Sequence, residues 1–335
     1  MRRRELVLAV AFLATACRET PPPGVTEVQL WAMGREGEVV QQMLPAFERE
    51  HPDVRVRVQQ IPWSAAHEKL LTAYVGGAMP DVFQAGNTWL PELHAVGALE
   101  PLDARIDAST IARDDYFPGI LDTNVIDGTT FALPWYVDTR LLFYRPDVLK
   151  AAGYTEMPRT WAGWREAMER VKARAGPNNH AILLPLREWQ VPVILALQNG
   201  ATLLRDGDTR GDFESAACRR AFEFYVDLFR SGLAPRAGDT ALANLYQDFA
   251  RGYFAFLVTG PWNIGEFAAR LPPATQWETA PLPAPDGSWP GVSLAGGASL
   301  ALSSNSGHKT AAWTVIEYLV SHQGEFYRLT GDLPA

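Results

Sequence analysis

The sequence predicts an α/β protein built on a parallel sheet, and two observations carry this prediction. Residues 25–83 alternate between strand-like and helix-like patterns in the order β-α-β-α-β, with Gly or Pro residues between the segments. Right-handed crossovers place the strands of such a unit side by side in one parallel sheet. The length of 335 residues, 47% of them hydrophobic, further suggests about two domains and a sizeable core.

Alternating apolar and polar residues define the predicted strands, and apolar residues at helical spacing define the helices. In Glu38–Glu50 the apolar positions fall on one face, although Pro45 predicts a kink or a late start there. The first predicted elements are strand Val25–Trp31, helix Glu38–Glu50, strand Val54–Val58, helix Ala65–Val75 and strand Pro80–Phe83.

The later part of the chain adds further elements. Thr139–Arg145 (TRLLFYR) is one strongly strand-like run, whereas Ala280–Gly291 is rich in Pro and Gly, which is typical of a loop. The other predicted elements are helices Trp161–Ala173, Ala217–Arg230, Leu245–Ala250 and Lys309–His322, and strand Phe254–Val258.

The first residues have the pattern of an export signal. Met1–Arg4 contains three arginines, and Leu6–Ala16 is an apolar run of eleven residues. That run is shorter than the ~20 residues that cross a bilayer. Cys17 follows directly and resembles a bacterial lipoprotein processing site, at which the thiol is acylated. We therefore expect a signal peptide over residues 1–16, a lipidated tether over residues 17–24 and an exported protein, periplasmic or on the cell surface, anchored to a membrane. A plain signal peptide followed by an incidental Cys is the alternative.

Composition and motifs exclude several classes of function. The formal net charge is −8 and no run of Lys or Arg follows the first four residues, so we expect no nucleic-acid partner. Two cysteines are too few for a disulfide scaffold or a Cys-rich metal site, and the six histidines lack the spacing of metal ligands. Because phosphate- and dinucleotide-binding loops are also missing from the sequence, we expect no metal and no cofactor.

Signals for catalysis are weak. Gly291–Ala295 (GVSLA) comes closest to a nucleophile elbow around Ser293, but it lacks the final Gly. Adjacent carboxylates such as Asp114 and Asp115 would serve glycoside hydrolysis only if they formed a pair in space. We therefore do not expect an enzyme, and a secreted glycoside hydrolase is the least favoured alternative.

Seven segments, spread over nearly all of the chain after residue 24, carry a resemblance to one known family. They are Leu30–Glu38, Phe47–Val54, Met79–Glu92, Asp127–Arg145, Gly252–Trp262, Leu294–Ala301 and Leu329–Ala335. In this order they resemble the bacterial extracellular solute-binding proteins of family 1, the maltose/maltodextrin-type receptors of ATP-driven sugar importers. Each segment is weak evidence alone, and their common order makes the resemblance specific.

The resemblance implies two α/β lobes of the periplasmic-binding-protein type II fold, with a ligand cleft between them. Hinge crossovers are expected near Pro134–Thr139 and Gly291–Gly297. Members of the family usually continue well beyond the position of Ala335 with helices that complete lobe two, so we expect the C-terminal part of lobe two to be missing. The expected boundaries are residues 25–137 plus 294–335 for lobe one and residues 138–293 for lobe two.

The implied function is the capture of a di- or oligosaccharide by the substrate-binding component of an ATP-driven importer, with hinge closure around the ligand. The implied partners are the carbohydrate, the membrane permease subunits and, through the lipid anchor, the membrane; we expect a monomer. A receptor for a non-sugar solute, such as a polyol or a glycerol phosphate, is the main alternative. The few cationic candidates, Arg35 and Arg187, disfavour an anionic ligand. A non-transport adhesin or sensor subunit is a further alternative.

Candidate ligand contacts follow from sugar chemistry, because aromatic rings suit the apolar faces of a sugar and charged or amide groups suit its hydroxyls. The resemblance assigns ligand contacts to three places. The stacking position is Trp262, and the first crossover holds Trp135, Tyr136 and Asp138. The loop after the first strand holds Arg35 and Glu36. Residue type and position at strand ends or in loops add Asn87, Thr88, Trp63, Glu188, Trp189, Gly296 and Gly297.

Several candidates have a structural alternative. Trp262, Trp135 and Trp189 could instead pack in a core or hinge, and Asp138 could pair with Arg140. The loop after the first strand could be a solvated turn.

Two further pairs of candidates also have structural alternatives. Asn87 or Thr88 could cap a helix. Gly296 and Gly297 could form a tight turn rather than let the backbone approach a ligand.

Overall fold

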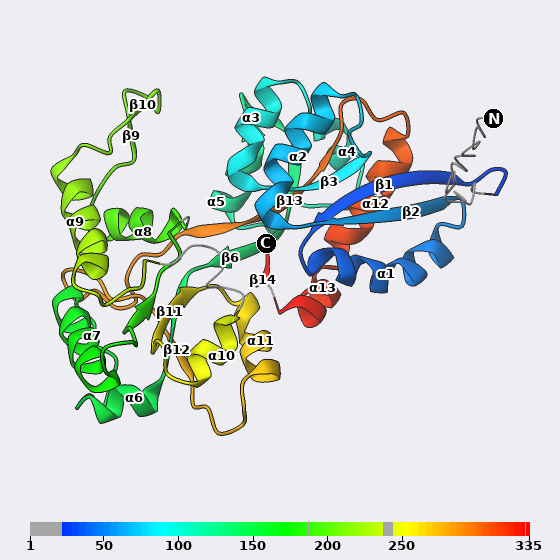
Figure 1. Cartoon of the computed structure of the whole chain (residues 1–335). Helices are drawn as coiled ribbons and strands as arrows, with labels where there is room; N and C mark the ends of the chain where they lie inside the picture. The colour runs from blue at the N-terminus through cyan, green and yellow to red at the C-terminus, as the bar shows by residue number, and fades with distance from the viewer. Residues whose placement is uncertain (1–21, 187, 237–243, 332) are drawn as a thin grey trace, which may run out of the picture.

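The protein folds into two α/β lobes, each with a sheet of its own (Figure 1). The structure is a computed structural model that describes residues 22–186, 188–236, 244–331 and 333–335. The predicted signal peptide, Cys17 and Arg187 lie outside the described residues. The first lobe holds a six-stranded sheet and the second a four-stranded sheet, so the predicted α/β class is confirmed.

The sheet of the first lobe combines distant parts of the chain. Its order is β14-β6-β13-β3-β1-β2, formed by Leu333–Pro334, Ala132–Thr139, Ala295–Leu302, Val82–Gly86, Thr26–Met33 and Val54–Ile61. β1 is parallel to β2 and to β3, which confirms the predicted β-α-β-α-β unit. β13 then pairs antiparallel with both β3 and β6, and β14 pairs antiparallel with β6.

Helices cover both faces of this sheet, because successive strand residues point to opposite faces. On β1, Val28 and Leu30 belong to a core shared with α1, α12 and α13, whereas Trp31 and Met33 belong to a core shared with α2 and α3 (Figure 1). The helices of this lobe are α1 (Glu36–Glu50), α2 (Trp63–Val75), α3 (Leu90–Ala95), α4 (Asp103–Asp107), α5 (Pro118–Leu121), α12 (Lys309–Ser321) and α13 (Gln323–Thr330). Its short elements are the 3-10 turns η1 (Asn87–Trp89), η2 (Arg113–Asp115) and η3 (Asp122–Asn124) and the hairpin β4 (Val125–Ile126) and β5 (Thr129–Thr130).

Two helices of the first lobe begin two residues earlier than their sequence patterns predict. α1 starts at Glu36 and continues through Pro45, so it has no late start. α2 starts at Trp63. A Cβ atom placed on Gly34 would lie 3.1 Å from Oε2 of Glu36 and 3.2 Å from the ring of Trp63, so the first turns of the two helices lie side by side.

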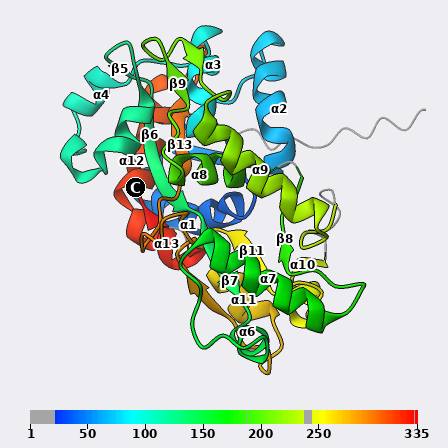
Figure 2. The same cartoon turned by 90° about the vertical axis from the view of Figure 1, so that its left-hand side faces the viewer.

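The sheet of the second lobe has the order β12-β7-β11-β8, formed by Glu278–Ala280, Leu141–Tyr144, Phe256–Thr259 and Ile182–Leu183. Helices α6 to α9 share a core on one face, and α10 and α11 cover the other face (Figures 1 and 2). The helices are α6 (Pro146–Ala151), α7 (Trp161–Ala175), α8 (Gln190–Gln198), α9 (Ala216–Arg230), α10 (Leu245–Ala250) and α11 (Trp262–Arg270), and a hairpin joins β9 (Leu204–Arg205) to β10 (Arg210–Gly211).

The chain passes between the lobes at two neighbouring positions. β6 ends at Thr139, Arg140 lies between the strands, and β7 begins at Leu141, so the single strand predicted over Thr139–Arg145 is two strands in different sheets. The returning segment joins the first sheet at Ala295, which pairs with Thr139. Among the described residues, none of the helices has both the length and the apolar character needed to cross a bilayer.

Candidate functional site

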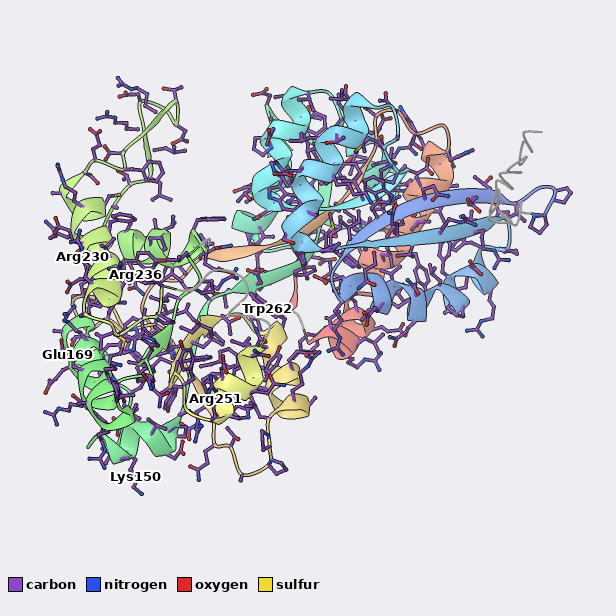
Figure 3. The ribbon with its side chains drawn as sticks, in the orientation of Figure 1. Lys150, Glu169, Arg230, Arg236, Arg251 and Trp262 are labelled. Carbon is purple, nitrogen blue, oxygen red and sulfur yellow. The ribbon has the colours of Figure 1, made fainter. Side chains whose placement is uncertain are left out.

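Side chains from both lobes meet around the crossing segments. Figure 3 places Trp262, the first residue of α11, on the side of the second lobe that is turned toward the first lobe. The end of β6 and the start of α1 supply the other groups. We use the term inter-lobe region for the surroundings of Arg35, Glu36, Asp138, Arg140, Trp262 and Glu266.

Arg140 connects the crossing segments to the second lobe. Its Nη1 donates a hydrogen bond to Oδ1 of Asp138 at 3.1 Å. Its backbone N–H donates to Oγ of Ser293 at 3.3 Å, and the Ser293 hydroxyl donates to the Arg140 carbonyl at 2.8 Å. Arg140 is only 8% exposed, so this ion pair is largely removed from water. Burial raises the pKa of the Asp138 carboxyl above its ordinary value, and Arg140 offsets part of that increase.

The indole ring of Trp262 is held by a cation–π contact and by close packing against the backbone. The guanidinium carbon of Arg140 lies 4.7 Å from the ring centroid, in the geometry of a cation–π contact. A Cβ atom placed on Gly260 would lie 1.7 Å from Cζ3 of Trp262, so the ring occupies space that only a glycine leaves open. The ring is thus fixed in place while part of the side chain remains exposed.

A buried carboxylate lies on the first-lobe side of the region. Glu36 is 8% exposed, and its Oε1 accepts a hydrogen bond from the Tyr136 hydroxyl at 2.7 Å. Gln84 Nε2 donates to the same hydroxyl at 3.1 Å, and Gln84 Oε1 accepts from the Met33 backbone N–H at 2.7 Å. Burial raises the pKa of Glu36, and hydrogen bonds from Tyr136, Gln84 and Trp63 counteract the increase in part.

Two tryptophans lie next to Glu36, on the side nearer the protein surface. The rings of Trp63 and Trp89 meet edge to face, with centroids 5.6 Å apart. The imidazole of His67 lies 5.1 Å from the Trp89 ring, and its Nε2 is within hydrogen-bond distance of Oε2 of Glu92, at 2.8 Å. Trp63 is 37% exposed, so it offers aromatic surface next to the buried acid.

An ion pair joins the two lobes directly. Arg35, just before α1, donates through Nη1 to Oε1 of Glu266 on α11 at 2.7 Å. Its Nη2 donates to the Leu329 carbonyl near the end of α13 at 3.0 Å. Arg270 is a second cation on Glu266, at 2.5 Å. In the part of the chain that the structure describes, no three His, Cys, Asp or Glu side chains gather as metal ligands.

Comparison with known proteins identifies the family. Residues 32–325 match the bacterial extracellular solute-binding proteins. This chain belongs to that family. Its members bind solutes, so the protein is a solute-binding protein and not an enzyme.

Three similar proteins show how far the likeness extends. The sugar-binding protein MalE from the phytopathogen Xanthomonas citri is 47% identical, with a TM-score of 0.79, and the match covers 92% of this chain and 79% of MalE. The diacetylchitobiose binding protein DasA of Streptomyces coelicolor is 26% identical over 289 residues, which are 84% of this chain and 66% of DasA. An uncharacterised lipoprotein of Streptomyces antibioticus is 24% identical over 348 aligned positions, gaps included, and the match covers 99% of this chain and 76% of the lipoprotein. The likeness to MalE confirms the periplasmic-binding-protein fold.

This solute-binding protein gathers some of the predicted site residues in one region. Glu36 contacts Tyr136 and Trp63, and Asp138 contacts Arg140, which in turn contacts Trp262. The predicted alternative for Asp138, a pair with Arg140, is therefore present.

Trp135 is a correction to the predicted site. Its side chain has no exposed surface, and its ring lies 4.3 Å from that of Phe326 within the core of the first lobe. The pairing of β6 with β13 shifts register at Trp135, and Trp135 lies in the same core as its neighbour Tyr136, so its ring is not available for stacking on a ligand. The packing alternative explains this residue.

The remaining candidates lie in other surroundings. Asn87 and Thr88 form the short turn η1 after β3, and neither side chain caps it or the following helix α3. Trp189 precedes α8 in the second lobe and is 48% exposed, with Glu188 beside it. Whether these residues contact a ligand stays a prediction.

Gly296 and Gly297 allow two strands to approach closely. A Cβ atom on Gly296 would lie 2.7 Å from Oδ1 of Asp138, and one on Gly297 would lie 2.1 Å from the Tyr136 carbonyl oxygen. Gly297 also has a φ of +134°. These contacts explain both glycines through the pairing of β13 with β6, without a ligand.

Sequence reasoning missed three residues of the region as contributors. Gln84 is polar at 0% exposure within β3, and a lone amide in an otherwise apolar strand is a signal that could have indicated a buried network. For Arg140, the sequence indicates only a pair with Asp138. Glu266 carries no comparable signal, because acidic residues on amphipathic helices are usually solvated.

Proposed function

We propose that this protein is the substrate-binding component of an ATP-driven importer and captures a di- or oligosaccharide in a cleft between its lobes. The observation that carries the proposal is the 47% identity with a sugar-binding protein, MalE, over 92% of this chain. The relative DasA, named as a diacetylchitobiose binding protein, adds a second carbohydrate ligand among similar proteins.

The chemistry of the inter-lobe region supports a polyhydroxylated ligand. Trp262 and Trp63 supply ring surface for the C–H faces of a sugar. Glu36 and Asp138 supply carboxylate oxygens, and a buried hydrogen bond to a charged group contributes about 1.5–3 kcal/mol. Rings for the apolar faces and acids for the hydroxyls are the combination that orients a neutral sugar.

The charges favour a neutral ligand over a glycerol phosphate. Arg35 pairs with Glu266, and Arg140 pairs with Asp138, so both cations already have a carboxylate. A phosphate would have to compete with these carboxylates for either arginine. A neutral polyol shares the hydroxyl chemistry of a sugar, and we keep it as the second candidate.

The two adjacent crossings support hinge closure as the working step. With lobe one at residues 25–137 plus 294–335 and lobe two at residues 138–293, the hinge falls where β6 and β13 pair. A thousandfold preference of the ligand for the closed form corresponds to about 4 kcal/mol. Two or three stacked rings and several charged hydrogen bonds can supply that difference.

We further propose a lipid anchor at Cys17, delivery to membrane permease subunits and a monomeric receptor. Support for the anchor comes from the apolar run that ends before Cys17 and from the similarity to a Streptomyces lipoprotein. Labelling with a radioactive fatty acid in a bacterial host tests the anchor, and Cys17→Ser should abolish incorporation.

A thermal-unfolding panel tests the ligand class. Maltose, maltotriose, N,N′-diacetylchitobiose, mannitol and glycerol 3-phosphate are added separately to the protein. A ligand at a hundredfold its dissociation constant adds about 2.7 kcal/mol to the free energy of unfolding and raises the melting temperature. We expect stabilisation by at least one of the oligosaccharides. Stabilisation by mannitol or glycerol 3-phosphate alone would contradict the sugar assignment.

A further inference from the structure

The inference concerns Arg140, whose contacts go beyond those of an ordinary ion pair. The guanidinium is held at one end by Asp138, at 3.1 Å, and lies over the ring of Trp262, at 4.7 Å from the centroid. Its backbone is tied at both its N–H and its carbonyl to Ser293 on the returning segment. Arg140 therefore touches both crossing segments and the first residue of α11.

We propose that Arg140 is a positioning residue that holds the Trp262 ring in the orientation in which it receives the ligand. This proposal rests on the proposed function in one respect, namely that the ligand binds to the Trp262 ring.

Burial makes this arrangement rigid. Arg140 is 8% exposed, so its guanidinium has lost most of its water and is confined by the groups around it. The ring of Trp262 cannot move toward the backbone, because it already fills the space above Gly260. Fixing a side chain before binding lowers the entropy lost on binding, which strengthens affinity without a new contact to the ligand.

The position of Arg140 also determines which face of the Trp262 indole is open to a ligand. Arg140 lies against one face of the indole, so a ligand stacks on the face that Arg140 does not cover. A planar guanidinium stacks on an aromatic face, whereas the ammonium group of lysine is a compact point charge. Arg140→Lys therefore keeps the charge opposite Asp138 and removes the stack.

A matched control is available in the second lobe. Arg145 also pairs with a nearby carboxylate, Asp147, at 2.7 Å, and its guanidinium lies 6.0 Å from the ring of Phe249. It is largely buried as well, and its Nη1 also donates to the backbone carbonyls of Phe249 and Ala250 on α10. Arg145→Lys thus makes the same chemical change in a comparable environment away from the inter-lobe region.

The test is a double-mutant cycle on Arg140→Lys and Trp262→Ala, with Arg145→Lys as the control. Calorimetric titration with maltotriose gives the dissociation constants, and tryptophan fluorescence of the unliganded proteins reports on the ring. We expect Arg140→Lys to weaken binding about fivefold, the equivalent of ~1 kcal/mol for a cation–π contact. We expect the same substitution to change the dissociation constant less than about twofold in the Trp262→Ala background, because coupled residues are not additive.

The unliganded proteins provide a readout that does not depend on any sugar. Arg140→Lys should change the emission spectrum, and that change should vanish when Trp262 is already replaced. Unchanged emission, an equal loss of affinity in Arg145→Lys, or an undiminished effect of Arg140→Lys in the Trp262→Ala background would each overturn the proposal. If neither maltotriose nor the other panel sugars bind, the proposed function fails, and the emission spectra alone still decide whether Arg140 positions the ring.

Discussion

At the scale of single residues, burial of charged groups dominates the inter-lobe region. Glu36 and Asp138 are both acids whose pKa values burial raises, and each is held by hydrogen bonds from neighbours. An ionised carboxylate without such partners would be too costly to bury. The region thus keeps acceptor groups in place before any ligand arrives.

Glu36 gives a prediction for the pH dependence of stability. Its pKa is raised in the folded state, so between the ordinary pKa of a glutamate and the raised value the folded protein keeps a proton that the unfolded chain has released. The free energy of unfolding therefore falls as the pH rises through this window, with a slope of at most ~1.4 kcal/mol per pH unit. Glu36→Gln should flatten this slope in urea denaturation measured at several pH values.

The control for this prediction is Glu38→Gln, at an exposed position on the same helix. It should retain the wild-type slope. An identical slope in wild type and Glu36→Gln would show that the Glu36 carboxyl does not contribute to the pH dependence of unfolding.

Single residues also show where sequence reasoning reached its limit. Trp262, Tyr136 and Glu36 could be nominated by residue type and by resemblance, and they do lie in or beside the inter-lobe region. Trp135 could not be separated from them, because the register of β6 shifts at this residue, and a strand irregularity of this kind has no clear signal in the local sequence. Both side chains are buried in the first-lobe core, but the Tyr136 hydroxyl reaches Glu36, whereas the Trp135 ring packs on Phe326.

At the scale of elements, the strength of the local pattern decided what could be predicted. The first two strands and α9, with its apolar residues at helical spacing, lie close to their predicted ranges. Local patterns could not predict that β13 and β6 join the first sheet, because that pairing links segments more than a hundred residues apart. Only the family resemblance placed residues 25–137 and 294–335 in one lobe. The run Thr139–Arg145 looked like one strand because its division at Arg140 depends on the lobes and not on local sequence.

The pairing of β13 with β6 gives a prediction for stability. At Gly297 a Cβ atom would lie 2.1 Å from a backbone carbonyl oxygen, and the φ of +134° is strained for any other residue. Gly297→Ala should therefore lower the free energy of unfolding by at least about 2 kcal/mol in urea denaturation.

Gly307→Ala is the matched control, because a Cβ atom there meets nothing within 4 Å. It should leave the free energy of unfolding within about 0.5 kcal/mol of wild type. Equal effects of the two substitutions would mean that the strands separate easily and that close approach is not required.

At the scale of the whole molecule, the two lobes are joined by the crossing segments of the chain and also by an ion pair. Arg35 reaches across to Glu266 and also to the end of α13, so it ties the first lobe to α11, the helix that begins with Trp262. This ion pair favours the arrangement in which the two lobes touch. The lobes themselves followed from the family resemblance, since length alone suggested two domains in sequence.

The ion pair predicts a salt-dependent affinity. Arg35 is about half exposed (51%), so the pair contributes at most ~1 kcal/mol and is screened by salt. Arg35→Met should weaken maltotriose binding by up to about fivefold at low salt and reduce the dependence of the dissociation constant on ionic strength. Calorimetric titrations at low and high salt measure both quantities.

Arg113→Met serves as the comparison, because Arg113 pairs with Asp103 and Asp107 inside the first lobe. It should bind like wild type at both salt concentrations. A salt dependence that survives in Arg35→Met would show that the Arg35–Glu266 pair does not hold the lobes in the binding arrangement.

The central claim is that a sugar stacks on Trp262 between the lobes, and calorimetric titration of Trp262→Ala with maltotriose tests it most directly. Trp289→Ala is the control, because Trp289 also lies under an arginine, Arg159 at 5.5 Å, but packs against the core of the second lobe. We predict that Trp262→Ala weakens binding about tenfold or more while the unliganded protein keeps its melting temperature, and that Trp289→Ala binds like wild type. An unchanged dissociation constant in Trp262→Ala would contradict the account.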